Sequence, residues 1–378
     1  MNILLNLLAG TDGGQITRAK AFLERVEQMY PNIHLTILKD ASVLNEVEPT
    51  ERRKIMNVDI GNRQFKALKR MIWENFTLPK LVEKQSPDLF LTFSHYLPFK
   101  NLKIPSLVGV SNLAPFSSEF LKDEPLLNRF RIFLLKKSII SSTKKANGVL
   151  ALSQACKDIL IQHGIDQKKI IVSHNGIEPE WAKIESNSQI LIQNKIQKPY
   201  LLYVSHFYRY KNHKRLIDAF NRFQRSKQND IKLVLVGKPK DESYFNEILL
   251  YVKNHDVKNR IQIIAGVERE ELKSLYQNAE LFIFPSLVEN SPNILLEAMM
   301  SAAPVATSSQ PPMPEHCGDA ALYFDGYQTS EIESVIIEAL SDSEKLENMR
   351  SKSLERAALF SWDRFTADLI DQIELILN

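Results

Sequence analysis

The chain has 378 residues, of which 44% are hydrophobic and 25% charged. This length exceeds the ~250–300 residues that one hydrophobic core usually serves, so two domains are expected. The composition excludes a disordered chain, and two cysteines, Cys156 and Cys317, are too few for a disulfide framework. No apolar run approaches the ~18–20 residues of a membrane span, and the apolar start lacks a basic leader region. We therefore expect a cytoplasmic protein.

The net charge of +3 is the sum of two halves of opposite sign. Residues 1–190 hold 26 Lys+Arg against 19 Asp+Glu, whereas residues 191–378 hold 22 against 26. Within 51–150 the excess is +10, from 18 basic and 8 acidic residues. Opposite signs in the two halves predict two domains with different partners.

Short apolar runs alternate with amphipathic stretches along the first half of the chain. We expect helices at 14–29 and 154–163, where apolar residues recur at helical spacing. The apolar runs predict strands at 2–8, 33–37, 88–93, 106–110, 148–152 and 169–173. Strands separated by helices are typical of a doubly wound parallel sheet.

The same pattern restarts at residue 199, after a polar segment without periodicity. It predicts strands at 199–204, 231–236, 261–264, 281–285 and 304–306, and helices at 212–225, 241–254, 268–277 and 293–301. Asn212 is the residue type that commonly caps a helix start. The sequence thus predicts an α/β fold with two Rossmann-like domains, over 1–178 and 197–362, joined by a linker over 179–196.

Ligands of such sheets bind outside the carboxyl ends of the strands, so the loops that follow strands are the places to search. The first of these loops reads Gly10-Thr11-Asp12-Gly13-Gly14, which does not fit GxGxxG, and the chain has no Walker A motif. Gly13 and Gly14 would let the backbone approach a ligand closely.

The strongest motif spans residues 285–299, with the sequence PSLVENSPNILLEAM. A strand ends at Pro285 and a helix begins near Asn293, and the free N–H groups of a helix start bind anions. Glu289 precedes this helix, and Glu297 lies about one turn inside it. A diphosphate on the helix start would therefore have one carboxylate on its sugar side and one on its nucleoside side.

A second motif places His206, Arg209 and Lys211 between a strand and a helix. A leaving diphosphate needs positive charge as its bond breaks, and Lys and Arg supply that charge without a metal ion.

Together these motifs resemble family 4 of the retaining, GT-B-fold glycosyltransferases, and the resemblance covers essentially the whole chain. Glu289 and Glu297 match the family's Glu-x7-Glu pattern, and 203–220 is similar to its strand, basic loop, Lys-Asn and helix. Further similar segments are 175–177, 233–237, 266–267 with 271–279, 314–324 and 360–362. The resemblance implies two Rossmann-like domains facing across a cleft, with a final helix, 363–378, that crosses back to the N-terminal domain.

The resemblance also implies an activity. A sugar would pass with retention from a UDP- or GDP-sugar to a lipid-linked or polysaccharide glycan acceptor in cell-surface polysaccharide synthesis. Glu289, Lys211 and Arg209 would be catalytic, and His95 and Asn112 would contact the acceptor. The donor would be bound by Gly13, Gly14, His206, Gly237, Lys238, Val267, Asn290, Ser291, Asn293, Ile294, Leu295 and Glu297. The chain has no Asp-x-Asp, so neither a metal nor another cofactor is expected.

Three positions depart from the family pattern. His206 stands where the family has a phosphate-binding Arg, with Arg209 between it and Lys211, so either side chain could take that role. Asn290-Ser291-Pro292 replaces the usual Gly-Phe-Gly, and Ser111 stands where relatives often carry His.

The basic segment 51–150 leaves two interpretations open. With its interleaved aromatic residues it could face an anionic membrane, and 129–137 is its best amphipathic candidate. Alternatively, its charges lie on solvated helix faces. No nucleic-acid-binding motif accompanies the charge, so nucleic acid is not expected.

Other functions also remain open. They are a glycosyltransferase with a soluble small-molecule acceptor, a non-catalytic nucleotide- or carbohydrate-binding member of an assembly complex, and a GT-B sugar-nucleotide epimerase.

Overall fold

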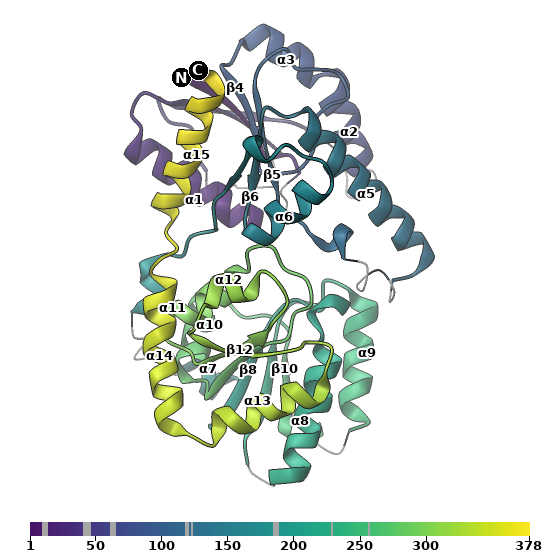
Figure 1. Ribbon diagram of the computed structural model, residues 1–378, viewed down its shortest axis with the longest axis vertical. Helices are drawn as coiled ribbons and strands as arrows, with labels where there is room; N and C mark the ends of the chain where they lie inside the picture. Colours follow the sequence, from purple (N-terminus) through teal and green to yellow (C-terminus); the bar gives the residue numbers. More distant parts are fainter. Residues whose placement is uncertain are drawn as a thin grey trace. The chain divides into compact units, whose positions relative to one another are not determined.

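The computed structural model describes residues 1–9, 14–40, 47–60, 66–117, 121, 124–183, 189–227, 230–255 and 258–378. The chain divides into two compact units (Figure 1). Unit 1 is Met1–Gly176 together with Ser361–Asn378, and unit 2 is Ile177–Phe360. Each unit contains one parallel sheet with helices, so the predicted pair of doubly wound α/β domains is confirmed.

Unit 1 is built on a seven-stranded sheet in the order β3-β2-β1-β4-β5-β6-β7. Its strands are β1 (Asn2–Asn6), β2 (His34–Lys39), β3 (Arg53–Asn57), β4 (Leu89–Thr92), β5 (Ser106–Val110), β6 (Gly148–Ala151) and β7 (Ile170–Val172). The strand order reverses between β1 and β4, where Ile3 lies opposite Leu89. In doubly wound sheets this reversal is where the carboxyl edge opens for ligands.

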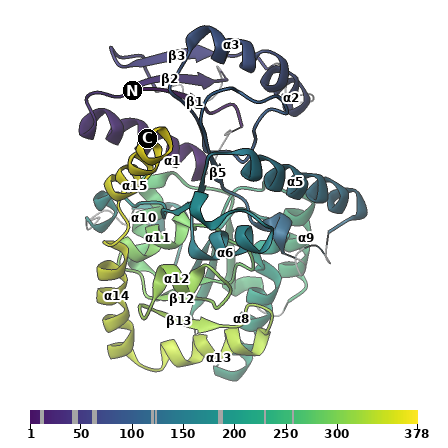
Figure 2. The same cartoon turned by 45° about the horizontal axis from the view of Figure 1, so that its top comes forward.

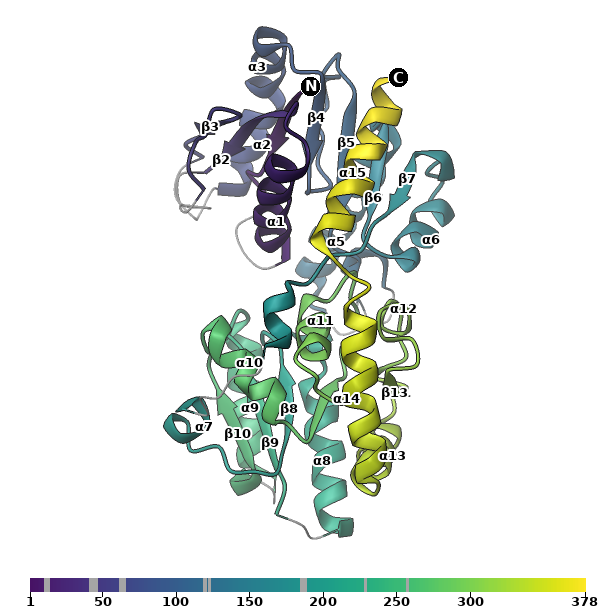
Figure 3. The same ribbon diagram turned by 90° about the vertical axis from the view of Figure 1, so that its left-hand side faces the viewer.

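Helices surround this sheet, and some of them bury apolar side chains in the core of unit 1. They are α1 (Gly14–Met29), α2 (Lys66–Phe76), α3 (Leu78–Gln85), α5 (Leu126–Lys145), α6 (Gln154–Gln162) and α15 (Trp362–Leu377), with 3-10 turns η2 (Ala114–Phe116) and η3 (Gln167–Lys169). The last helix, α15, runs beside α1 (Figure 3) and buries Phe365, Leu369 and Ile373 in the core of unit 1. The predicted return of the final helix to the N-terminal domain is confirmed.

Unit 2 repeats the architecture with six strands in the order β10-β9-β8-β11-β12-β13. These are β8 (Tyr200–Val204), β9 (Lys232–Val236), β10 (Ile261–Ile264), β11 (Leu281–Phe284), β12 (Val305–Ser308) and β13 (Ala321–Phe324). Its helices are α7 (Gln189–Gln193), α8 (His213–Lys227), α9 (Glu242–Lys253), α10 (Arg269–Asn278), α11 (Asn293–Met300), α12 (Met313–Cys317), α13 (Thr329–Leu340) and α14 (Ser343–Ala357), with 3-10 turns η4 (Pro179–Ala182), η5 (Arg209–Lys211) and η6 (Lys258–Arg260). The order reverses between β8 and β11, so the loops after these two strands are neighbours.

The segment 179–196, expected as a linker, belongs to unit 2. Trp181, Ile190 and Leu191 are buried in its core. The expectation was wrong because these apolar residues are too widely spaced to form a periodic pattern. Edge strand β3 was also missed, since its side chains are half-buried or exposed and form no apolar run.

Candidate functional site

A buried ion pair lies at the carboxyl edge of the unit 2 sheet. Lys211 ends η5, after β8, and its Nζ contacts Oε1 of Glu289, in the loop after β11. The two side chains are only 10% and 12% exposed. The Tyr203 hydroxyl donates to the Lys211 carbonyl at 2.6 Å and so fixes the backbone of the lysine. Two residues predicted as catalytic are thus in direct contact.

Glu289 is further held by Ser286, whose Oγ donates to the same Oε1 at 2.6 Å. Oε2 of Glu289 receives no hydrogen bond from the part of the chain that the structure describes. One carboxylate oxygen is therefore fixed by protein donors, while the other can accept a hydrogen bond from a ligand. Ser286 was part of the recognised motif but was not predicted as a site residue.

Asn212 joins the two loops that carry the ion pair. Its backbone is left-handed, with φ 63°, and its side-chain amide donates to the carbonyls of Pro285, at 3.0 Å, and Gly326, at 2.7 Å. Leu287 N also donates to the Tyr210 carbonyl at 2.9 Å. Asn212 was expected to cap α8. Instead, its amide connects the loops, which is possible because β8 and β11 are neighbours.

The other two residues of this loop that were predicted to bind phosphate point elsewhere. Arg209 pairs with Glu247 of α9 at 2.7 Å, and its guanidinium lies 5.2 Å from the centre of the Tyr244 ring. His206 accepts a long hydrogen bond, 3.4 Å, from the backbone N of Lys238. The structure therefore brings Lys211, but neither Arg209 nor His206, into contact with Glu289.

Three of the residues predicted to bind the donor lie at the ends of β9 and β10. A Cβ on Gly237 would come within 1.8 Å of the Ser205 carbonyl oxygen, so only glycine lets these two loops run this close. Lys238 follows it and is exposed, while Val267 is half-buried and packs on the unit 2 core. Val236 lies opposite Ile264, so the three predicted residues share one edge of the sheet.

The predicted donor segment 290–295 leads into α11, which begins at Asn293 after Pro292. Asn290 and Leu295 are buried, whereas Ser291, Asn293 and Ile294 are half-buried. Oγ of Ser291 is 3.2 Å from Nε2 of His316, a buried residue that the sequence analysis did not single out. The first amide groups of a helix have no acceptor inside the helix, so this end presents donors to an anion.

Glu297 is one turn along α11 and has an unusual environment. Burial raises its pKa from 4.5 to about 7, although the charge of Arg269 acts in the opposite direction. Tyr276 is fully buried, and its hydroxyl has no hydrogen-bond partner within the described ranges. Burial, followed by the charge of Glu297, raises the pKa of Tyr276 well above its ordinary value.

Arg269 and Tyr276 were both missed at the sequence level. They lie on α10, about two turns apart, and Arg269 also stacks over Trp181 with 5.2 Å between the guanidinium and the ring centre. The helix itself was predicted. Which of its side chains face α11 depends on tertiary packing, so these two residues could not be singled out.

The predicted site residues of unit 1 are at the carboxyl edge of its sheet. His95 is half-buried, and burial together with the charge of Arg70 lowers its pKa to about 4, so its ring is neutral at pH 7. Asn112 is exposed, and its Oδ1 accepts a hydrogen bond from Ala114 N at 2.9 Å. Gly14 is exposed and opens α1, whereas Gly13 lies outside the described residues.

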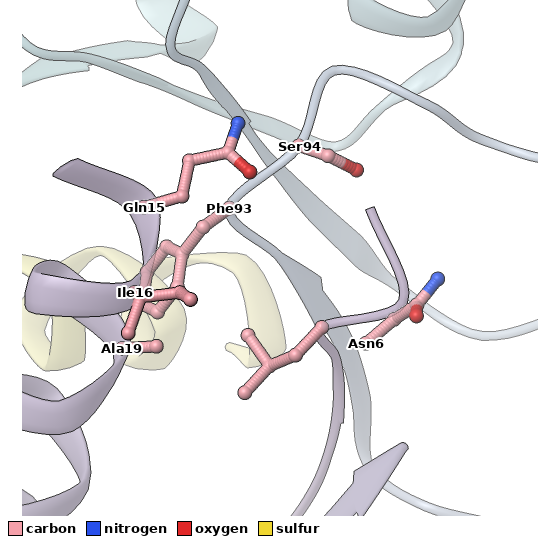
Figure 4. Close-up of a pocket in the computed structure, with 7 residues that line it drawn as sticks. Asn6, Gln15, Ile16, Ala19, Phe93 and Ser94 are labelled. Carbon is pink, nitrogen blue, oxygen red and sulfur yellow. The ribbon is translucent and has the colours of Figure 1, made fainter. Parts of the chain in front are cut away.

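A small pocket lies where the strand order of unit 1 reverses (Figure 4). Asn6 ends β1, Phe93 follows β4, and Gln15 lies in the first turn of α1. The remaining lining residues are Leu7, Ile16, Ala19 and Ser94. The sequence predicted this edge of the sheet as a ligand site but not these residues.

Two features of the described residues bear on partners. No helix in these ranges is long and apolar enough to cross a membrane. Within the same ranges, no three His, Cys, Asp or Glu side chains form a group that could hold a metal ion. The expectation that the protein needs no metal ion stays a prediction.

Two family profiles match the chain and together cover most of it. The family described as "Glycosyltransferase Family 4" matches residues 33–181, and "Glycosyl transferases group 1" matches residues 186–356. The chain belongs to glycosyltransferase family 4. The resemblance noted in the sequence is therefore confirmed.

Several relatives of this glycosyltransferase are named as mannosyltransferases. It is 24% identical over 251 residues to "O-antigen chain mannosyltransferase B" of Escherichia coli, which is 65% of each chain. It is 25% identical over 296 residues to "O-antigen chain mannosyltransferase RfbU" of Salmonella typhimurium, 76% of this chain and 77% of that one. The match to "Serotype-specific mannosyltransferase WbdA" of Escherichia coli is 25% over 252 residues and spans 63% of this chain but only 31% of WbdA.

Solved structures share the fold at low identity. Anabaena Alr3699/HepE in complex with UDP-glucose superposes with a TM-score of 0.76 at 14% identity, over 99% of this chain and 100% of that one. WaaG, a glycosyltransferase involved in lipopolysaccharide biosynthesis, gives 0.74 at 16% identity, over 97% and 99%. The predicted GT-B fold is confirmed.

Proposed function

We propose that this protein is a retaining glycosyltransferase of cell-surface polysaccharide synthesis. It moves a sugar from a UDP- or GDP-sugar to a lipid-linked or polysaccharide glycan acceptor. Family membership supports the reaction class, and the O-antigen relatives support the pathway. The observation that carries the proposal is the Lys211–Glu289 ion pair beside the start of α11.

The ion pair suits the breaking of a sugar–phosphate bond. As the bond between the sugar and the diphosphate breaks, its electron pair stays on the diphosphate, and Lys211 stabilises that charge. Glu289 lies beside the lysine, with Oε2 available to a sugar hydroxyl. In this proposal Lys211 takes the role that a metal ion has in other transferases, so no metal is required.

The remaining residues bind other parts of the donor. Glu297 accepts hydrogen bonds from the ribose hydroxyls, and Gly237, Lys238 and Val267 line the base. Backbone groups of 290–295 bind the sugar and diphosphate. Arg209 pairs with Glu247, and His206 lies beside Lys238. Either side chain could be the second phosphate ligand.

The acceptor side includes a membrane surface in this proposal. Helix α5 extends away from the sheet of unit 1 (Figure 2). Five large apolar residues follow one another on it at helical spacing, and each is at least half exposed: Leu126, Leu127, Phe130, Phe133 and Leu134. Arg129, Arg131, Lys136 and Lys137 flank them, which matches an anionic lipid surface at the cytoplasmic face. This exposed apolar stripe favours a lipid-linked acceptor over a soluble one.

The activity is tested by release of nucleoside diphosphate from a panel of UDP- and GDP-sugars in EDTA, with and without lipid-linked glycan acceptors. One donor should be consumed, and Lys211→Ala and Glu297→Ala should each reduce its turnover by at least ~100-fold. Lys227→Ala, at the exposed end of α8, is the matched control and should turn over normally. Nucleotide binding without turnover on any acceptor would support a non-catalytic binding protein instead.

A further inference from the structure

Arg18, on α1, is a buried cation outside the candidate donor site. Its residue surface is 2% exposed. Its Nε donates to Oδ1 of Asn175 at 2.8 Å, and its NH1 donates to Oγ of Ser111 at 3.0 Å. The guanidinium carbon lies 5.8 Å from the centre of the Phe93 ring. These three neighbours follow β7, β5 and β4, so the guanidinium lies at the carboxyl edge of the unit 1 sheet.

The charge of Arg18 has no counterion within the described ranges of the chain. Its partners are an amide, a hydroxyl and an aromatic ring, and no carboxylate in the described part of the chain pairs with it. Burial lowers its pKa to about 9, so the group is still charged at pH 7. Other arginines of unit 1 differ: Arg53 pairs with Glu27 at 2.7 Å and Arg25 with Asp363 at 3.1 Å. Buried charges are normally paired, so an unpaired one marks a place for an anion.

The guanidinium also has donors to offer. It carries five N–H groups, and the two hydrogen bonds engage Nε and NH1. NH2 makes no hydrogen bond to any described residue. A planar guanidinium binds the oxygens of a phosphate with two parallel hydrogen bonds, and a fixed guanidinium loses little freedom in doing so. Asn175 and Ser111 hold the group in place for such a ligand.

We propose that Arg18 is an anion-binding residue of unit 1 that takes a phosphate group of a substrate. The inference rests on the proposed function for the identity of the substrates. The phosphate belongs to a phosphate-bearing lipid-linked acceptor. The small pocket beside α1 shares Phe93 with Arg18 (Figure 4).

Binding is tested with pyrophosphate as the probe, titrated by calorimetry into the full-length protein. The wild type should show two sites, one at Arg18 and one at Lys211. Arg18→Gln should lose one site, Lys211→Gln the other, and the double variant both. Arg25→Gln is the matched control, because Arg25 lies on the same helix and already has a carboxylate partner; it should keep both sites. Two unchanged sites in Arg18→Gln would overturn the proposal.

Arg18→Lys keeps the charge but not the planar fork, and it covers the case in which Arg18→Gln does not fold. It should bind pyrophosphate at this site at least ~10-fold more weakly than the wild type. Unchanged affinity in a folded Arg18→Lys variant would contradict the proposal. A purely structural arginine would lower the thermal midpoint in both variants without changing pyrophosphate binding.

Two further measurements on Arg18→Gln test the acceptor as the source of the phosphate. The Kd for UDP or GDP should stay unchanged, and the KM for the acceptor should rise. A raised Kd for the nucleoside diphosphate would contradict the proposal. The pyrophosphate titration needs no turnover, so a failure of the proposed transferase activity would be distinguishable from a failure of the anion site.

Discussion

Lys211 and Glu289 are joined by an ion pair although 78 residues separate them in the chain. Their contact follows from strand order. β8 and β11 are neighbours at the point where the sheet reverses, with Leu281 opposite Leu201, so the loops after both strands emerge side by side. Asn212 then joins the two loops through the carbonyl of Pro285, and it also binds the carbonyl of Gly326 after β13. The fold thus places a cation and a carboxylate together before any ligand binds.

The ion pair should contribute to stability as a unit. Lys211→Met and Glu289→Gln should each lower the free energy of unfolding by about 1–3 kcal/mol, because each leaves a poorly solvated partner without its counterion. The double variant should lose less than the sum of the two. Urea unfolding of the four proteins measures the coupling. Additive losses would show that the two side chains do not interact in solution.

Glu297 should make stability depend on pH. Its folded pKa of about 7 exceeds its ordinary value of 4.5, so between these two values the folded state binds more protons than the unfolded state. Stability from this group is therefore present below about pH 4.5 and is lost as the pH rises to about 7. Glu297→Gln should be as stable as the wild type at pH 5 and more stable by about 1–3 kcal/mol at pH 8. A constant difference between the variants across this range would refute the raised pKa.

Gly237 should tolerate no side chain. The Cβ of alanine would meet the Ser205 carbonyl oxygen at 1.8 Å, which forces the loops after β8 and β9 apart. Gly237→Ala should cost about 1–3 kcal/mol of stability and weaken nucleotide binding. Ser205→Ala leaves the backbone in place and is the control for both thermal unfolding and calorimetry. If Gly237→Ala bound nucleotide as tightly as the wild type, the loop after β9 would not line the base pocket.

Membrane binding should depend on both the charge and the apolar stripe of α5. The triple variant Arg131→Gln, Lys136→Gln, Lys137→Gln should bind vesicles with anionic lipid several-fold more weakly, and binding of the wild type should fall with salt. Phe130→Ser should weaken binding even at low salt. Lys145 is unsuitable for this test, because its Nζ donates to the carbonyls of Pro98 and Phe99.

Co-sedimentation with vesicles measures these effects. If vesicle binding does not depend on salt, or if there is none, the charges of 51–150 lie on solvated helix faces and do not bind a membrane. A concentration-dependent dimer that Phe130→Ser dissolves would instead identify the stripe as a contact between copies of the chain.

The sequence predicted the parts of the fold that local patterns encode. The strand at residues 261–264 and the helix at 14–29 were placed as the structure has them, because each has a clear apolar period. The stretch 179–196 was misread because Trp181 and Ile190 are buried by partners distant in the chain. The candidate site was likewise predicted only in part.

The motif identified Lys211 and Glu289, and the structure joins them. The sequence did not distinguish Arg209 from His206, because the partner of Arg209 is Glu247 on a separate helix. Arg18 was invisible for a related reason: nothing near it in the sequence reveals that α1 buries it among neutral partners. Local sequence patterns indicate which loops carry functional residues. Which charges pair across loops can be predicted only when the strand order and the packing are known.

The central claim is that unit 2 holds a nucleotide-sugar donor through Lys211 without a metal ion. Its most direct test is calorimetric titration of UDP- and GDP-sugars, in EDTA, into the wild type and Lys211→Ala. We predict that the wild type binds the sugars of one base and that Lys211→Ala binds them at least ~10-fold more weakly. Equal affinity in the two proteins, or binding that requires a divalent cation, would contradict the claim.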